Sequence, residues 1–185
     1  MKRRAVLAAA IVAGLGLTGA APGPWTIDRE ASTIGMSIRA LGQTRSGHFS
    51  DWRGDIVFDP AAPENTRADV VVQAASLRMS PDTLTRRALG PGFLDTARRP
   101  TIRFVLRSLE PRGGARYTAR ADVTVKGRTG VVVFPVDLRV SDDRAHLAGA
   151  FTLDRTDYGI GTAGPWNTLI GREVTVRVAL QARRV

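Results

Sequence analysis

Two histidines, His48 and His146, are the side chains best suited to act as an acid, a base or a metal ligand near neutral pH. Both lie among polar, turn-forming residues. A metal site needs several converging ligands, and the chain has no cysteine and no paired-histidine spacing. A serine hydrolase would carry its nucleophile in a G-x-S-x-G turn, which is absent. The sequence therefore predicts no catalytic residue, no metal site and no cofactor, and it places both histidines on the surface.

A glycine-rich stretch, residues 159–164, matches the G-x-G-x-x-G pattern of dinucleotide-binding proteins. That pattern works where its last glycine opens a helix in a βαβ unit. Here Pro165-Trp166-Asn167 follow and a strand-like segment comes next, so we expect a loop between two strands. Just before it, Arg155 and Asp157 predict a hydrogen-bonded corner or a local ion pair. Trp166 either covers a ligand from this loop or packs on one side as an ordinary aromatic.

The N-terminus has the pattern of a secretory signal peptide. Lys2-Arg3-Arg4 is a basic start, residues 5–17 are apolar, and residues 18–20 are small. We predict cleavage after Ala20, one domain over residues 21–185, and a soluble protein of the periplasm. The apolar run is too short to span a bilayer, which takes about 20 residues.

Positive charge is concentrated in one part of the chain. Residues 86–128 hold eleven basic and three acidic residues, a net charge of +8, against +10 for the whole chain. Two interpretations stay open: a solvated face, or a surface that makes transient contact with an anionic membrane or with phosphates. We expect no binding to nucleic acid, because aromatic residues do not alternate with the basic ones and an exported protein does not meet it.

Alternation of apolar and polar residues dominates the rest of the chain and predicts strands. The last one is the clearest, with apolar residues at every second position from Val174 to Ala182. Residues 42–49 are rich in turn-forming residues instead. Altogether the sequence predicts an all-β fold, an antiparallel barrel or sandwich of about eight strands.

One segment, residues 80–95, predicts a short helical insertion. Ser80 is a candidate cap, Pro81 suits the first helical position, and Gly90-Pro91-Gly92 ends the helix. Leu84 and Phe93 are apolar on either side of that break. We expect the insertion to cover the mouth of the barrel, either as a moving lid or as a fixed plug.

An eight-stranded barrel has an interior that side chains fill or that holds one small ligand. The alternation leaves both outcomes open. The candidate ligand-binding residues are the apolar positions of the inward faces, the insertion and the glycine-rich loop: Met36, Ile38, Phe49, Ile56, Phe58, Val70, Val72, Leu84, Phe93, Ile102, Phe104, Ala121, Val123, Phe134, Val136, Phe151 and Trp166.

Several short sequence pieces follow one another in a characteristic order from Trp25 to the C-terminus. They are Trp25-Thr26-Ile27-Asp28 with Ser32, Gly47-His48-Phe49 with residues 54–59, Phe93-Leu94-Asp95 with residues 100–104, residues 123–127, and residues 155–160. In order and spacing the chain resembles the YceI-like family of exported, lipocalin-like proteins. The resemblance implies an extended antiparallel barrel whose apolar cavity holds a polyisoprenoid or another long-chain amphiphile.

The chain departs from that family's pattern at three places. Ala31 and Ala40 occupy positions where the family often has histidines. Residues 83–87 read Thr-Leu-Thr-Arg-Arg, where the family usually has an aspartate and a His-Leu-Arg run. These differences leave the apolar pattern intact but change polar positions, so contacts to a ligand's head group do not carry over.

The resemblance leads to one functional hypothesis with two alternatives. The hypothesis is an exported lipid-binding protein that transports, stores or sequesters an isoprenoid-like chain without catalysis. The alternatives are an enzyme acting on such a chain and a filled barrel that binds partners through its basic face. The residues alone do not separate the three.

Overall fold

The computed structural model describes residues 25–58 and 62–184, so the predicted signal peptide lies outside the described residues. Most of the described chain is β-strand. The strands are β1 Trp25–Ala40, β2 Gln43–Phe49, β3 Trp52–Val57, β4 Arg67–Gln73, β5 Leu77–Met79, β6 Thr101–Pro111, β7 Arg116–Val125, β8 Arg128–Ser141, β9 Arg144–Asp154 and β10 Ile170–Arg184.

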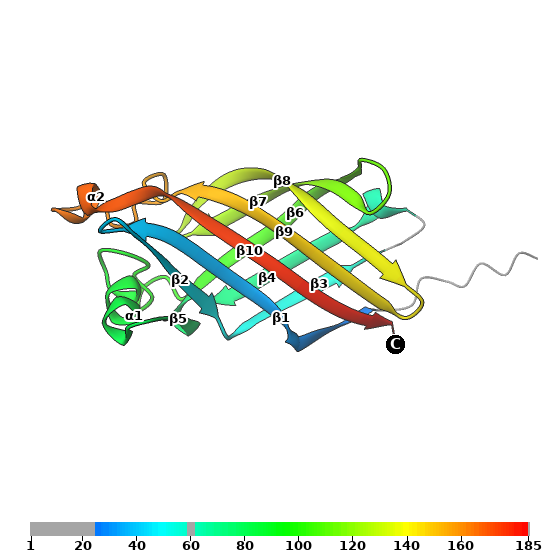
Figure 1. The fold of residues 1–185 in the computed structure, drawn as a ribbon, viewed down its shortest axis with the longest axis horizontal. Coiled ribbons are helices and arrows are strands. Elements are labelled where there is room, and N and C mark those ends of the chain that lie inside the picture. The colour runs from blue at the N-terminus through cyan, green and yellow to red at the C-terminus, as the bar shows by residue number, and fades with distance from the viewer. Residues whose placement is uncertain (1–24, 59–61, 185) are drawn as a thin grey trace, which may run out of the picture.

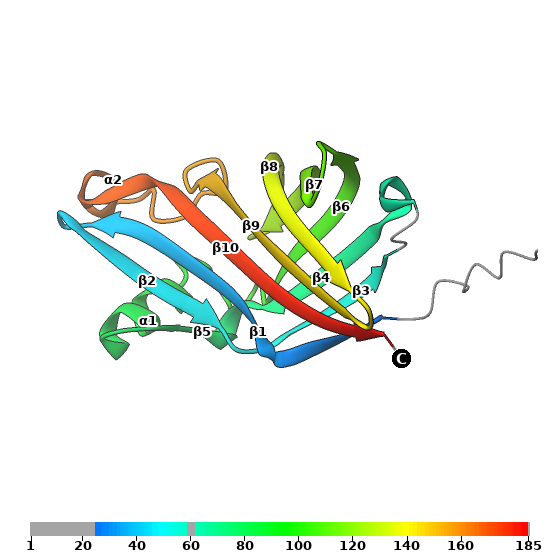
Figure 2. The same cartoon turned by 45° about the vertical axis from the view of Figure 1, so that its right-hand side comes forward.

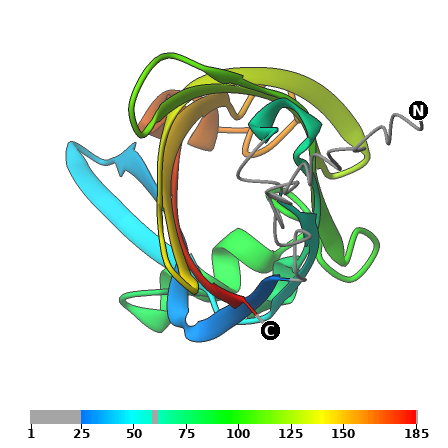
Figure 3. The same cartoon turned by 90° about the vertical axis from the view of Figure 1, so that its right-hand side faces the viewer.

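These strands form one antiparallel sheet in the order β3-β4-β6-β7-β8-β9-β10-β1-β2-β5. The sheet curls until its strands surround a central axis, as the end-on view in Figure 3 shows. The predicted lipocalin-like fold is confirmed. Ten strands take part in the described residues, rather than about eight, because polar residues 43–49 form β2 where we expected turns and residues 77–79 form the short β5.

The two edges of the sheet meet at a corner, which completes the curl. The pair β3/β4 continues into the pair β2/β5, with the chain bending at residues 50–51 and 74–76. Backbone hydrogen bonds hold the bend: Gln73 N–H donates to Asp51 O at 2.9 Å, and Ser50 N–H to Ser76 O at 3.4 Å. The Ser76 hydroxyl also donates to Asp51 O at 3.3 Å. The bend therefore links the two ends of the sheet, although β3 and β5 each pair with one strand only.

The predicted helical insertion is present, with different bounds. Helix α1 covers Asp82–Leu89 and residues 91–94 are turns. Gly90 ends the helix as expected, but Ser80 does not cap it. Pro81 occupies the N-cap position, and no side chain there bonds to the helix. Instead, buried Thr85 fastens α1 to strand β5, since its hydroxyl accepts from Met79 N–H at 2.8 Å and donates to Met79 O at 3.0 Å.

The remaining helical elements of the described chain are short. They are the 3₁₀ turns η1 Pro63–Asn65 and η2 Ala74–Ser76 and the helix α2 Trp166–Leu169, which precedes β10. Both α-helices lie at the same end of the barrel (Figures 1 and 2). Within the described ranges, no helix has the length and apolar character needed to cross a membrane.

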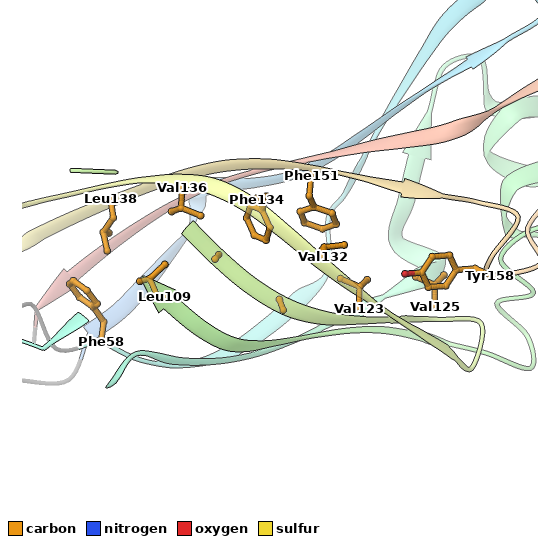
Figure 4. Packing of buried hydrophobic residues seen from close by; sticks show 12 residues of the cluster. Phe58, Leu109, Val123, Val125, Val132, Phe134, Val136, Leu138, Phe151 and Tyr158 are labelled. Carbon is orange, nitrogen blue, oxygen red and sulfur yellow. The ribbon is translucent and has the colours of Figure 1, made fainter. Parts of the chain in front are cut away.

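The core follows from strict alternation along the strands. In β8 the buried residues Val132, Phe134, Val136 and Leu138 alternate with exposed ones. Figure 4 shows this row beside inward residues of β6, β7 and β9. Phe134 packs on Phe151 with ring centroids 4.9 Å apart. One face of the sheet therefore points to a shared interior.

The basic segment, residues 86–128, lies largely on the outer surface, where part of its charge is neutralised. Arg107 binds Asp122 at 2.6 Å and Arg112 binds Glu110 at 3.0 Å, while Arg103 pairs with Asp69. The segment is thus not a uniform cationic face.

Candidate ligand-binding cavity

A cavity of about 360 Å³ runs inside the barrel. That volume lies within the range of about 300–1,000 Å³ typical of small-molecule sites. On β10 its lining consists of apolar residues at alternate positions, from Ile170 and Val174 to Leu180 and Ala182. The lined part of β10 covers about 40 Å of strand at about 3.3 Å per residue. The interior is therefore long and narrow.

Sixteen of the seventeen candidate residues line this cavity: Met36, Ile38, Phe49, Ile56, Phe58, Val70, Val72, Leu84, Phe93, Ile102, Phe104, Val123, Phe134, Val136, Phe151 and Trp166. Ala121 does not. Although it lies on the inward face, it is 0% exposed, because the residues of the core cluster pack over it. A larger residue at Ala121 would therefore overpack the wall rather than fill the cavity.

Aromatic and cationic side chains meet at the end where the helices lie. Phe93 contacts Trp166 edge-to-face, with ring centroids 6.2 Å apart. Trp166 also contacts Arg87 of α1, whose guanidinium carbon lies 4.1 Å from the centre of the Trp166 ring. Arg87 is exposed, and a cation–π contact at an exposed site contributes about 0.5–1 kcal/mol. These three residues, with Leu84, cover the helical end of the cavity.

The two loops that carry Phe93 and Trp166 are joined directly. Gly161 N–H donates to Gly92 O at 2.8 Å. Gly161 has φ +60°, and a Cβ there would lie 2.9 Å from Phe93 Cε1. Glycine is needed at this position for both its conformation and the close approach of the ring. Within the glycine-rich stretch, Gly161 thus serves packing, and the short α2 and strand β10 follow rather than a βαβ unit.

Arg155 organises the loop between β9 and β10. It is 1% exposed, and its guanidinium nitrogens donate to five backbone carbonyls at 2.8–3.0 Å. The carbonyls belong to Ile160, Gly161, Asn167, Ile170 and Gly171. Burial lowers the pKa of Arg155, which the nearby Asp154 carboxylate partly offsets. An arginine nevertheless stays charged in proteins, so the loop encloses a permanent cation.

Asp154 stabilises the corner where this loop begins. Its carboxylate accepts from the hydroxyl and the backbone N–H of Thr156, at 2.6 and 2.9 Å, and pairs with Arg172 at 2.6 Å. The Thr156 hydrogen bonds, and then Arg172, lower its pKa to about 2. The expected hydrogen-bonded corner is therefore present, with Asp154 rather than Asp157 supplying the carboxylate.

The opposite end of the cavity is lined by aromatic and aliphatic residues. Trp25 packs on Phe58 with ring centroids 6.0 Å apart, close to Leu109 and Leu138. Two buried polar atoms also lie here, Trp25 Nε1 and Thr66 Oγ1. Neither has a hydrogen-bond partner in the part of the chain that the structure describes.

Ionisable groups are few in the lining. Among the described residues they are Arg45, Arg87, Arg155 and Tyr158. Burial, with a smaller contribution from Asp157, raises the pKa of Tyr158 and keeps its hydroxyl neutral. The chemistry these groups offer is apolar burial with cationic contacts near one end. A nucleophile with an adjacent base is not part of this described lining.

Both histidines are exposed, as predicted, and no cluster of three metal-ligating side chains occurs in residues 25–58 and 62–184. Sequence reasoning missed Arg45 and the central role of Arg155. The signal for Arg155 was available, because a charged residue opens the Arg-Thr-Asp-Tyr-Gly piece directly before a glycine-rich loop.

Fold and cavity together define a lipocalin-like antiparallel β-barrel with an apolar interior. The chain belongs to the YceI-like domain family, whose sequence model matches residues 25–182. The family predicted from the order of the sequence pieces is thereby confirmed.

Relatives support the same assignment. The chain is 28% identical over 160 residues to a UPF0312 protein of Pseudomonas syringae pv. tomato, covering 82% of this chain and 83% of the relative. BcnA of Burkholderia cenocepacia has the same fold, with a TM-score of 0.79 and 22% identity over 84% of this chain and 99% of BcnA. A polyisoprenoid-binding domain from Saccharophagus degradans aligns with a TM-score of 0.69 and 17% identity, covering 88% and 99% of the two chains.

Proposed function

We propose that this protein is a periplasmic carrier that holds one isoprenoid-like or other long-chain lipid in its barrel, for transport, storage or sequestration, without changing it chemically. The observation that carries the proposal is the long cavity lined almost entirely by apolar side chains. The polyisoprenoid-binding domain of Saccharophagus degradans, which shares the fold, makes an isoprenoid chain the first ligand to test.

The energetics favour a long flexible tail. Each buried methylene contributes about 0.8 kcal/mol before the entropy cost of ordering the chain. A preformed pocket adds little further cost on the protein side, because its walls need not reorganise. The narrow shape selects one extended chain over a compact ligand.

The positions of the charged side chains predict the orientation of a bound lipid. Arg155 in the lining is taken up by backbone carbonyls, whereas the other two lining arginines, Arg45 and Arg87, lie at the helical end. The opposite end is lined by Trp25, Phe58 and Leu109. We expect the apolar tail to point towards Trp25 and a polar or anionic head group to lie near the two arginines.

Native mass spectrometry of protein purified from its own periplasm tests the proposal. A co-purifying lipid of intact covalent structure supports it. The matched pair Val178→Trp and Ala179→Trp sharpens the test, because these neighbours on β10 point to opposite faces: Val178 lines the cavity and Ala179 is exposed outside.

We expect Val178→Trp to lose the bound lipid and Ala179→Trp to retain it, with both barrels still unfolding cooperatively. Repeated isolation of an empty wild-type protein would argue against a carrier. A bound product that differs chemically from the lipid supplied in a defined reconstitution would instead indicate an enzyme.

A further inference from the structure

The turn between β1 and β2 has an unusual residue at its tip. Leu41 and Gly42 both have positive φ, +53° and +76°, and Ala40 pairs with Gln43. This geometry is that of a two-residue hairpin turn in which asparagine or aspartate normally precedes glycine. Leucine is unfavourable there, because its Cβ crowds the backbone in the left-handed region. Leu41 is also 61% exposed, so neither backbone preference nor burial explains it.

A second exposed leucine lies beside the first. Leu169, at the end of α2, is 42% exposed, and its carbonyl accepts a hydrogen bond from Leu41 N–H at 3.0 Å. We call Leu41 and Leu169 the leucine pair. In Figure 1 the end of β1 lies beside α2, at the helical end of the barrel. Leu41 also lines the cavity together with Trp166 and Ile170, so this apolar tip is continuous with the interior.

The surroundings of the leucine pair are basic. The segments at this end of the barrel, residues 39–45, 82–99, 126–128 and 154–173, contain ten basic and five acidic residues, a net charge of +5. The described segments at the other end, residues 25–30, 62–67, 109–116, 137–146 and 181–184, contain eight basic and seven acidic residues, a net charge of +1. Positive potential is therefore concentrated around the exposed leucines.

We propose that this end of the barrel docks on an anionic bilayer surface, with the leucine pair inserted at the boundary between head groups and acyl chains. Exposed apolar side chains ringed by arginines are suited to such an interface, where burial and attraction to anionic lipids add together. Docking in this orientation brings the helical end of the cavity against the membrane. The inference goes beyond lipid carriage, because it concerns the empty protein and does not depend on the identity of the ligand.

Co-sedimentation with vesicles tests the docking. Lipid-free protein is mixed with vesicles of phosphatidylcholine, with and without phosphatidylglycerol, at low and high salt. The variant Leu41→Asn/Leu169→Gln removes the pair without endangering the fold, because asparagine suits the left-handed turn position better than leucine. The control is Val131→Ser/Val133→Ser, which removes two valines that are 54% and 58% exposed on the outer face of β8.

We expect wild-type protein to bind phosphatidylglycerol vesicles and to lose binding at high salt. The leucine variant should bind about tenfold more weakly, the order of one buried leucine side chain, while the valine control binds like wild type. Equal binding by all three proteins overturns the proposal. So does self-association that disappears in the leucine variant without vesicle binding, since the pair would then join two copies of the chain. Uptake of a fluorescent long-chain lipid, measured without vesicles, reports separately on the carrier function.

Discussion

The two ends of the barrel are stabilised in different ways. At the helical end, α1, α2 and the loop after β9 are held by Arg155, by backbone hydrogen bonds between loops and by aromatic contacts. At the opposite end, Trp25, Phe58, Leu109 and Leu138 pack together as an apolar cluster. Loops held by hydrogen bonds can exchange one set of bonds for another. A closely packed apolar cluster can rearrange only by exposing apolar surface to water, which costs free energy. If the protein carries a lipid as proposed, this difference predicts that the lipid enters and leaves at the helical end.

The largest effect is expected from Arg155→Met. The variant leaves five backbone carbonyls without their donor inside the protein, and unsatisfied buried groups cost about 1–3 kcal/mol each before relaxation. We expect a loss of at least about 4 kcal/mol in the free energy of unfolding, measured by urea denaturation. Arg155→Lys should recover only a small part, because an ammonium group has three donors and no planar fork. A loss below about 1 kcal/mol would show that the loop does not depend on this side chain.

A smaller effect is expected from Leu109→Ala at the opposite end. Leu109 is 2% exposed, and its truncation should cost about 2–3 kcal/mol through lost burial and the cavity left behind. Thermal unfolding checks the value. If Leu109→Ala proved more damaging than Arg155→Met, the assignment of the polar end as the more sensitive one would be wrong.

Phe93→Ala tests whether the helical end moves as a lid or stays as a plug. Removing the ring deletes the contact with Trp166, of the order of 0.5–1.5 kcal/mol. We expect faster hydrogen exchange across residues 83–94 and faster release of a bound lipid probe, with exchange at Leu109 unchanged. In the wild-type protein, bound lipid should slow exchange in the same segment. Slow exchange there that ignores both ligand and substitution would identify a fixed plug.

The smallest effect concerns acid pH. Because the pKa of Asp154 is lowered to about 2 from 3.8, its contribution to stability is complete above about pH 4 and is lost as the pH falls through about 2. Asp154→Asn should therefore flatten the decline in stability between these pH values. Unfolding midpoints measured across this range check the prediction, with Asp157→Asn as the control. Identical acid profiles for wild type and Asp154→Asn would contradict the assigned role.

Much of the barrel could be predicted from the sequence, because side chains on a strand alternate with a period of two. The inward faces of β8 and β10 followed directly from that pattern. Strand β2 did not, since residues such as Gln43 and Ser46 give no apolar alternation at a sheet edge. The N-terminal cap of α1 was also wrong, because Pro81 takes the N-cap position that we expected Ser80 to fill.

The cavity was predictable only in part. Alternation shows which face a residue is on, and this placed residues such as Met36 and Phe151 correctly on the lining. It does not show whether neighbouring residues pack over a side chain, and Ala121, which they cover completely, does not line the cavity. Arg155 was missed for another reason. Its burial depends on carbonyls from residues 160–171, whose convergence is a property of the folded loop.

Arg155 has a consequence for how the helical end responds to its environment. Its guanidinium stands in the loop as a calcium ion stands in a binding loop, surrounded by oxygen atoms from the backbone, but it is attached covalently to the chain. A chelator cannot remove it, and no pH compatible with folding deprotonates it. The loop that frames the helical end of the cavity therefore always contains its own cation. We expect the shape of this end to respond to lipid, membrane and salt, and not to the supply of a metal.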